Sequence, residues 1–336
     1  MNTLLQLLLF SAKLVVVAIF ILIVFAGILA IASRGKDKLR GRISVKHLNK
    51  KYRETRDKLS AEILSGTQFK KFSREQKKAN QKKAKSHEKH PPKNVFVLTF
   101  NGDIKASAVT ALREEVTALL GIATPRDEIV VKVESGGGMV HAYGLAASQL
   151  MRIRQKHIPL TVVVDKIAAS GGYMMACIGN KILAAPFAII GSIGVIVQLP
   201  NFHRLLKDKH VDYEQITAGQ FKRTLTLFGE NTREGREKMH EEVEEIHQLF
   251  KNLIAENRPI VDVQKVATGE HWLGSQALSL NLVDELRTSD DYLLTQSEHA
   301  EVYEVCYHMK KSLAEKMSSS ARALFGARSI EETYIM

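Results

Sequence analysis

The stretch that decides the fold is Asp165-Lys166-Ile167-Ala168-Ala169-Ser170-Gly171-Gly172-Tyr173-Met174-Met175-Ala176. An apolar run typical of a β-strand, residues 160–164, precedes it, and a run compatible with a helix, residues 173–178, follows it. Ser170 is therefore expected on a sharp turn from strand to helix, where two glycines permit a tight backbone and leave N–H groups open to a ligand. A Ser-Gly-Gly turn can also be purely structural, so the rest of the chain must decide its meaning.

Length and composition allow one large domain or two ordinary ones, because the chain has 336 residues and 45% of them are hydrophobic. The two cysteines, Cys177 and Cys306, make neither a disulfide framework nor a metal-ligand cluster, and we expect no metal and no cofactor. Cys177 follows Ser170 on the predicted helix and is expected to be a small buried apolar residue.

The net charge of +12 is concentrated in one segment of the chain. Residues 34–93 contain 21 Lys and Arg against 6 Asp and Glu, a net charge of +15, which leaves −3 for the remainder. We expect a helical or disordered extension here that contacts anionic lipid headgroups, with a solvated spacer as the alternative. Nucleic-acid binding is disfavoured because no aromatic residues are interleaved for base stacking.

Residues 14–32 carry no charge and are long enough to span a bilayer as a helix. Ala30-Ile31-Ala32 resembles a signal-peptidase site, so a cleaved signal peptide is the alternative, but the apolar run exceeds the ~7–15 residues of a signal h-region. Basic residues follow at once. By the positive-inside rule, the bulk of the protein should then face the cytoplasm, with the periplasmic side as the alternative.

From Val95 onward strands and helices alternate, which predicts parallel strands joined by right-handed crossovers. The expected strands are residues 95–100, 128–133, 160–164, 181–185, 195–199, 212–216 and 302–307. The expected helices are residues 106–120, 140–154, 173–178, 202–209, 233–257 and a basic amphipathic segment around 313–324.

Catalysis by a serine nucleophile requires a base and an oxyanion hole. Residues 168–172 do not form the Gly-x-Ser-x-Gly elbow of hydrolases that use His, and no nearby histidine lies in a recognisable motif: His141, His157, His203, His210. A lysine removed from water is the alternative, since desolvation favours its neutral amine. Lys222, among Phe221, Leu225 and Leu227, is the candidate, and the glycine run 136–138 at a strand-to-helix junction could bind an oxyanion together with the Gly171 N–H.

A series of ordered motifs resembles the signal peptide peptidase A (protease IV) family over residues 95–286. The motifs are the glycine run 136–138, Ala169-Ser170-Gly171-Gly172-Tyr173, Gly191-Ser192-Ile193-Gly194-Val195, Gly219-Gln220-Phe221-Lys222, residues 269–277 and Leu282-Val283-Asp284. With its apolar amino terminus and basic extension, the chain is most similar to the SohB branch of that family. The resemblance implies a ClpP/crotonase-like spiral of β-β-α units in the α/β class, and a Ser–Lys dyad peptidase.

The family pattern assigns a role to five residues of this chain. Ser170 is implied as the nucleophile, Lys222 as the general base, Ser192 as the residue that orients the lysine amine, and Gly171 and Gly137 as oxyanion donors. The implied protein is an endopeptidase of the bacterial inner membrane, acting on small or unfolded peptides such as signal-peptide remnants, and assembled as a homo-oligomeric ring.

Two residues depart from the family pattern: Arg223 follows the lysine where an acidic residue is common, and Asn281 replaces a glycine before Leu282. Asn tolerates a left-handed backbone, so Asn281 is an acceptable replacement for that glycine.

The expected domains are a membrane anchor (1–33), a basic extension (34–92), a peptidase domain (93–290) and a carboxy-terminal strand and helix (291–336). Two other functions remain open on the sequence. A crotonase-like acyl-CoA enzyme would also use backbone N–H groups as an oxyanion hole. A non-catalytic membrane scaffold would need neither Ser170 nor Lys222.

Overall fold

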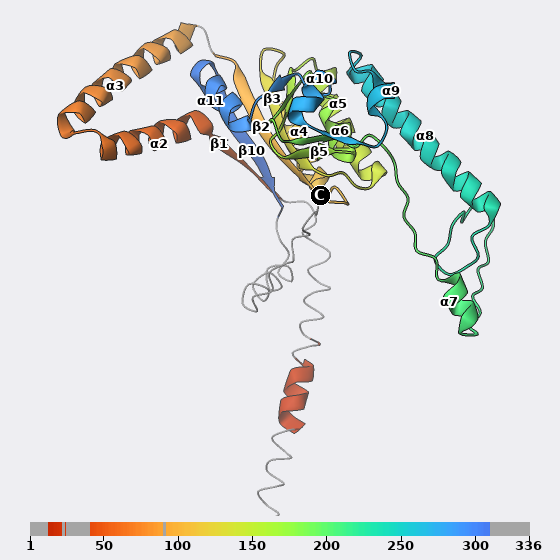
Figure 1. The fold of residues 1–336 in the computed structure, drawn as a ribbon. Helices are drawn as coiled ribbons and strands as arrows, with labels where there is room; N and C mark the ends of the chain where they lie inside the picture. The colour runs from red at the N-terminus through yellow and green to blue at the C-terminus, as the bar shows by residue number, and fades with distance from the viewer. Residues whose placement is uncertain (1–12, 22–23, 25–40, 90–91, 310–336) are drawn as a thin grey trace, which may run out of the picture. The chain divides into compact units, whose positions relative to one another are not determined.

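The computed structural model describes residues 13–21, 24, 41–89 and 92–309 of the protein (Figure 1). Residues 44–306 form one compact unit, which contains the regions discussed below. Residues 13–21 are helical, and most of the predicted membrane span 14–32 lies outside the described residues, as does the helix expected around 313–324. Within the described residues no helix combines the length and the hydrophobicity needed to cross a bilayer.

The described part of the chain has a mixed α/β fold with one sheet, whose main strands run parallel as the alternating pattern predicts. In spatial order the strands are β1 (Arg42–His47), β10 (Glu301–His308), β2 (Asn94–Gly102), β3 (Glu128–Ser135), β4 (Leu160–Val164), β6 (Lys181–Ala184) and β9 (Glu285–Leu286). Three short strands lie off this path: β5 (Ile167–Ala169), β7 (Ile189–Gly191) and β8 (His271–Leu273).

Side chains of β2 show how the sheet buries both of its faces. Phe96, Leu98 and Phe100 belong to one apolar cluster, and the alternating Val95 and Val97 belong to a second cluster. This alternation is the period of two that a strand imposes, and two covered faces explain why the parallel strands read as continuous apolar runs. The larger cluster includes buried residues of α4 (Val109–Leu119), α5 (Val140–Gln155) and α6 (Gly171–Ala176).

The sheet divides at the carboxyl end of β3, and this division determines where Ser170 lies. β3 pairs with β4 over Ile129–Lys132, whereas its last residue, Ser135, pairs with Ala168 of β5. β5 pairs with β7, and β7 pairs with β8 in antiparallel fashion. Each of β4 and β6 is thus followed by a short strand that leaves the main sheet, and Ser170 comes directly after β5.

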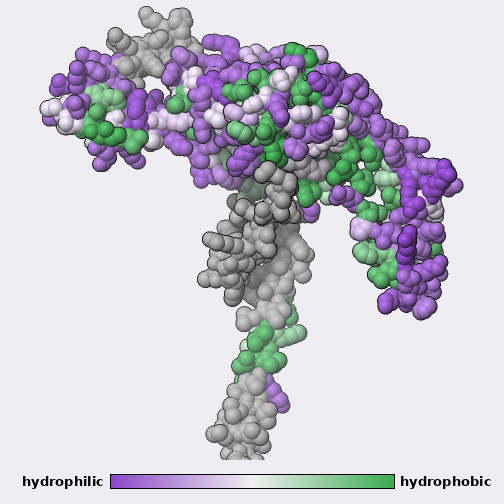
Figure 2. Space-filling view, viewed as in Figure 1, coloured by the Kyte–Doolittle hydropathy of each residue, from purple (hydrophilic) through white to green (hydrophobic). Residues whose placement is uncertain are grey.

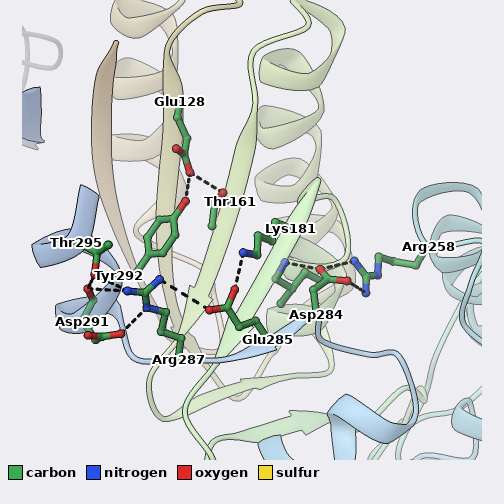
Figure 3. Close-up of polar contacts among 11 residues, drawn as sticks. Glu128, Thr161, Lys181, Arg258, Asp284, Glu285, Arg287, Asp291, Tyr292 and Thr295 are labelled. Atoms are coloured by element: carbon green, nitrogen blue, oxygen red, sulfur yellow. Dashed lines mark hydrogen bonds and ion pairs between the residues drawn. The ribbon is translucent and has the colours of Figure 1, made fainter. Parts of the chain in front are cut away.

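A row of polar contacts joins the sheet to residues from the later part of the chain, from Arg258 onward (Figure 3). Glu128 accepts hydrogen bonds from Thr161 at 2.7 Å and from Tyr292 of α11 (Ser289–His299) at 2.5 Å. Asp284, from the Leu-Val-Asp motif, accepts from the Ile182 backbone N–H at 2.7 Å and pairs with the Arg258 guanidinium at 2.7 and 2.8 Å. The motif aspartate is therefore structural: it ties the end of α8 (Arg233–Asn257) to the sheet.

Several sequence-based predictions need correction. Residues 195–199 and 212–216 are not strands, because neither segment pairs with a neighbouring strand in the described chain. The basic extension is helical over α2 (Leu48–Ile63) and α3 (Gly66–Lys89), as expected, but it also contains β1, a strand that the sequence did not predict and that pairs with β10. The remaining helices of the described chain are α7 (His203–Asp208), α9 (Val263–Val266) and α10 (Gly274–Ser279).

Candidate active site

Ser170 occupies a strained backbone position between β5 and α6. Its φ of 51° and ψ of −118° lie in a region that residues with a Cβ rarely adopt, at a typical cost of about 1–3 kcal/mol. Two hydrogen bonds hold it there: the Ser170 N–H donates to the Gly191 carbonyl at 2.7 Å, and the Ser170 carbonyl accepts from the Met174 N–H at 2.9 Å. The residue is half-buried, so its backbone is held while part of the residue stays reachable from solvent.

The glycine run meets Ser170 at Gly137. A Cβ on Gly137 would lie 2.7 Å from the Gly171 nitrogen and 2.7 Å from the Ser170 Cβ, a separation that atoms do not tolerate. Gly137 also has a φ of +95°, so both the space and the backbone conformation require glycine. The structure thus brings together three residues that the sequence singled out: Ser170, Gly171 and Gly137.

Ser192 is a fourth predicted site residue, and it lies beside Ser170. Ala169 of β5 is in register with Gly191 of β7, so the next residues along these parallel strands are Ser170 and Ser192. Ser192 also has a positive φ, 50°, and its N–H donates to the Glu270 carbonyl at 2.7 Å. Its half-buried side chain starts from a backbone fixed next to that of Ser170.

Lys222 lies elsewhere, on the segment between β7 and α8. It is exposed, and it lines a groove of about 700 Å³ together with residues such as Tyr213, Ile216 and Leu225, a lining that includes neither Ser170 nor Ser192. The water-free surroundings expected of Lys222 are therefore not found in the single chain. The described structure does not bring Lys222 together with the other four site residues.

The segment around Lys222, residues 195–228, exposes many large apolar side chains. Ile216 is 96% exposed and Ile196 is 79% exposed, and a small aromatic cluster of Phe202, Tyr213 and Phe228 supplies local packing. Figure 2 shows these hydrophobic side chains gathered beside the hydrophilic surface of α8. The segment has apolar surface that the single chain does not cover.

Cys177 is excluded as a nucleophile. It is buried, as expected, and burial raises the pKa of its thiol to about 12, so the thiolate is scarce at neutral pH. Asn281 adopts a φ of 59°, a left-handed backbone that asparagine tolerates.

Two residues beneath the glycine run escaped the sequence analysis. Ser135 and Tyr143 are buried and hydrogen-bonded to each other, at 2.5 Å. The sequence does contain a hint, because Tyr143 shares the buried face of α5 with apolar residues, and a buried tyrosine hydroxyl needs a hydrogen-bond partner. The apolar residues on that face are Ala146, Ala147, Leu150 and Ile153.

Comparisons with known proteins agree on one family. The profile described as Peptidase family S49 N-terminal matches residues 2–150, and that of Peptidase family S49 matches residues 152–303. The chain is 46% identical to "Probable protease SohB" of Haemophilus influenzae over 93% of this chain and 91% of that protein. It is 43% identical to "Probable protease SohB" of Buchnera aphidicola subsp. Schlechtendalia chinensis over 88% of this chain and 100% of that protein.

Two solved structures also resemble the chain, at 15% identity, and both are alanine mutants of the 1510-N membrane-bound stomatin-specific protease. One has a serine replaced, with a TM-score of 0.44, and the match covers 63% of this chain and 97% of that chain. The other has a lysine replaced and is in complex with a substrate peptide, with a TM-score of 0.42 and coverage of 69% and 99%.

Proposed function

The chain belongs to peptidase family S49, and on this premise we propose that it is a serine endopeptidase with Ser170 as nucleophile and Lys222 as general base. Ser192 orients the lysine amine. The strands that leave the sheet after β4 and β6 support a finer description of the fold, a ClpP/crotonase-like spiral of β-β-α units. The observation that best supports this proposal is the strained backbone of Ser170. It packs directly against Gly137, and the amide of Gly171, the first residue of α6, follows it.

The oxyanion hole needs two N–H groups aimed at the developing negative charge. Gly171 supplies one. The family pattern implies Gly137 for the other, but its N–H donates to Ser135 Oγ at 3.0 Å. No hydrogen bond from the Gly138 N–H is found in the described chain, so we assign the second donor to Gly138.

The reaction proceeds in two halves. The neutral Lys222 amine takes the proton of Ser170 Oγ as that oxygen attacks the peptide carbonyl, and the oxyanion forms against the two amides. The lysine ammonium then gives its proton to the leaving nitrogen as the C–N bond breaks. Water, activated by the same lysine, hydrolyses the resulting ester and restores the serine.

The dyad requires Lys222 to reach Ser170 and to lose water. A homo-oligomer provides the loss of water, because a neighbouring copy can cover the exposed apolar side chains of residues 195–228 and enclose the lysine. In a ring every site is completed in the same way, because a head-to-tail interface whose rotation closes gives each copy the same neighbour.

The remaining assignments concern the membrane. The anchor at residues 14–32 holds the peptidase at a bacterial inner membrane, and the exposed basic residues of α2 and α3 contact anionic headgroups. Substrates are then small or unfolded peptides such as signal-peptide remnants. The charges after residue 32 favour a cytoplasmic catalytic domain, which reporters fused after Met336 can test: active β-galactosidase is expected, and active β-lactamase would contradict it.

The deciding experiment is intact-mass analysis after treatment with a serine-directed phosphonate. We expect one adduct on Ser170 in the natural chain, none in Ser170→Ala and a much slower one in Lys222→Ala. An unlabelled natural chain that also fails to hydrolyse casein would contradict the peptidase assignment and favour the acyl-CoA enzyme or the scaffold.

A further inference from the structure

A series of hydrogen bonds through two buried hydroxyl groups runs beneath the glycine run. The Gly137 N–H donates to Ser135 Oγ at 3.0 Å, Ser135 Oγ lies 2.5 Å from Tyr143 Oη, and the Tyr143 hydroxyl donates to the Asp103 carbonyl at 2.7 Å. Tyr143 is 0% exposed and Ser135 is 2% exposed. These contacts connect the glycine run to the loop that follows β2.

The proton positions in this series follow from simple counting. A tyrosine hydroxyl has one proton, and that of Tyr143 goes to the Asp103 carbonyl. The Ser135 proton must therefore go to Tyr143 Oη, which leaves the Ser135 lone pairs free to accept the Gly137 N–H. Each of these two hydroxyls therefore accepts from one member of the series and donates to the next, so the links reinforce one another and fix the direction of the Gly137 amide.

The ring of Tyr143 reaches the other half of the proposed oxyanion hole. A Cβ on Gly171 would lie 2.4 Å from Tyr143 Cγ, so the ring packs directly behind the Gly171 backbone. Phe100 holds the ring from the side in an edge-on contact, with centroids 6.2 Å apart. Tyr143 thus touches the Gly171 backbone with its ring and, through Ser135, controls the peptide that precedes the Gly138 amide.

We propose that Tyr143 and Ser135 are positioning residues that set the two amides of the oxyanion hole, Gly171 N–H and Gly138 N–H. This inference rests on the proposed peptidase function. It has a physical basis: preorganised donors stabilise a transition state only while they point at the developing charge, and a displacement of about 1 Å can cost about 10²-fold in rate. Neither residue touches the substrate, so both act through the backbone that they hold.

Tyr173 offers a matched control. It is also 0% exposed, it lies on α6 next to Ser170, and its hydroxyl donates to the Leu282 carbonyl at 3.0 Å. Tyr173→Phe removes the same atom from an equally buried ring, but that atom is not bonded to the glycine run. The comparison separates a loss of amide positioning from a general loss of packing.

The experiment uses the full chain and measures kcat, KM and melting temperature with fluorescent casein. Tyr143→Phe and Ser135→Ala should each lower kcat about 10- to 100-fold. KM should stay within about twofold, since the amides act mainly in the transition state. Tyr173→Phe should keep kcat within about twofold, and the double variant Tyr143→Phe/Ser135→Ala should be little worse than either single one, because the pair acts as a unit.

A kcat near that of the natural chain in Tyr143→Phe or Ser135→Ala overturns the inference, as does an equal loss in Tyr173→Phe or a loss confined to KM. If Tyr143→Phe does not fold, the smaller change Ser135→Ala decides alone. The proposed function fails in a different way: activity would then persist in Ser170→Ala, whatever the state of Tyr143.

Discussion

The two ends of α8 are held in different ways. At its carboxyl end Phe250 and Ile254 enter the main core, and the following Arg258, 5% exposed, pairs with Asp284 through two hydrogen bonds. At its amino end the pair of Arg233 and Glu237 has side chains that are 91% and 59% exposed. The carboxyl end packs into the body that carries Ser170, and the amino end follows the segment that carries Lys222.

The amino end of α8 contacts that segment only locally. Gly235 is buried against the Thr224 carbonyl, and Lys238 lies 5.8 Å from the centre of the Phe221 ring. Lys222 itself remains exposed. A single chain therefore brings Ser170, Gly171, Gly137 and Ser192 together, whereas the surroundings of Lys222, in the proposed dyad, depend on what covers residues 195–228.

The largest expected effect tests whether the two regions form one site. Ser170→Ala and Lys222→Ala should each lower casein hydrolysis by about 10⁴-fold or more, and the double variant should be little worse, because a dyad acts as a unit. Near-natural hydrolysis in Lys222→Ala would show that the lysine-bearing segment is not part of the chemistry.

Gly137→Ala tests the close packing at the serine end. The added Cβ would lie 2.7 Å from the Gly171 nitrogen, so we expect hydrolysis to fall about 10³-fold, as for a displaced oxyanion donor. Gly144→Ala is the control, because a Cβ there has no atom within 4 Å and α5 gains up to about 1 kcal/mol of helix propensity. Equal activity in the two variants would argue against the packing account.

Ser192→Ala probes the link between the two regions. Removing one orienting hydrogen bond should lower kcat about 10²-fold, less than removal of the dyad itself. Kinetic assays that show the same loss in Ser192→Ala and Lys222→Ala would make Ser192 an equal partner in the chemistry.

Asp284→Ala compares the two ends of α8 in stability. It leaves the buried Arg258 charge unpaired, so urea unfolding should show a loss of about 3 kcal/mol in unfolding free energy. Glu237→Ala breaks only the exposed pair at the other end and should cost less than about 0.5 kcal/mol. Similar losses at both ends would remove the distinction drawn between them.

Ile216→Gln has the smallest expected effect on the fold of one copy. The side chain is 96% exposed, so the unfolding free energy of the monomer should change by less than about 0.5 kcal/mol. Sedimentation should instead show a weakened homo-oligomer, because the substitution reduces the apolar area that a neighbouring copy covers. A natural chain that sediments as a monomer would contradict the proposed assembly.

Local patterns in the sequence determined much of the fold. Continuous apolar runs identified β2, β3, β4 and β6, and the apolar periodicity ending at Pro259 gave α8 its observed bounds. The Ala-Ala-Ser-Gly-Gly order predicts Ser170 on a tight turn, where the structure has it. These features succeed because each depends on residues that are neighbours along the chain.

Only the tertiary structure decided the rest. Some decisive contacts join residues from separate elements, and no periodicity in the sequence predicts them. Examples are Gly137 with Gly171, Tyr143 with Ser135, and Arg258 with Asp284. Residues 195–199 have the composition of a strand, yet a strand forms only where another offers its backbone hydrogen bonds, and none in the described chain does so. The sequence singled out the serine on its turn; which surfaces surround the lysine is decided by contacts between distant parts of the chain and, as we propose, between copies.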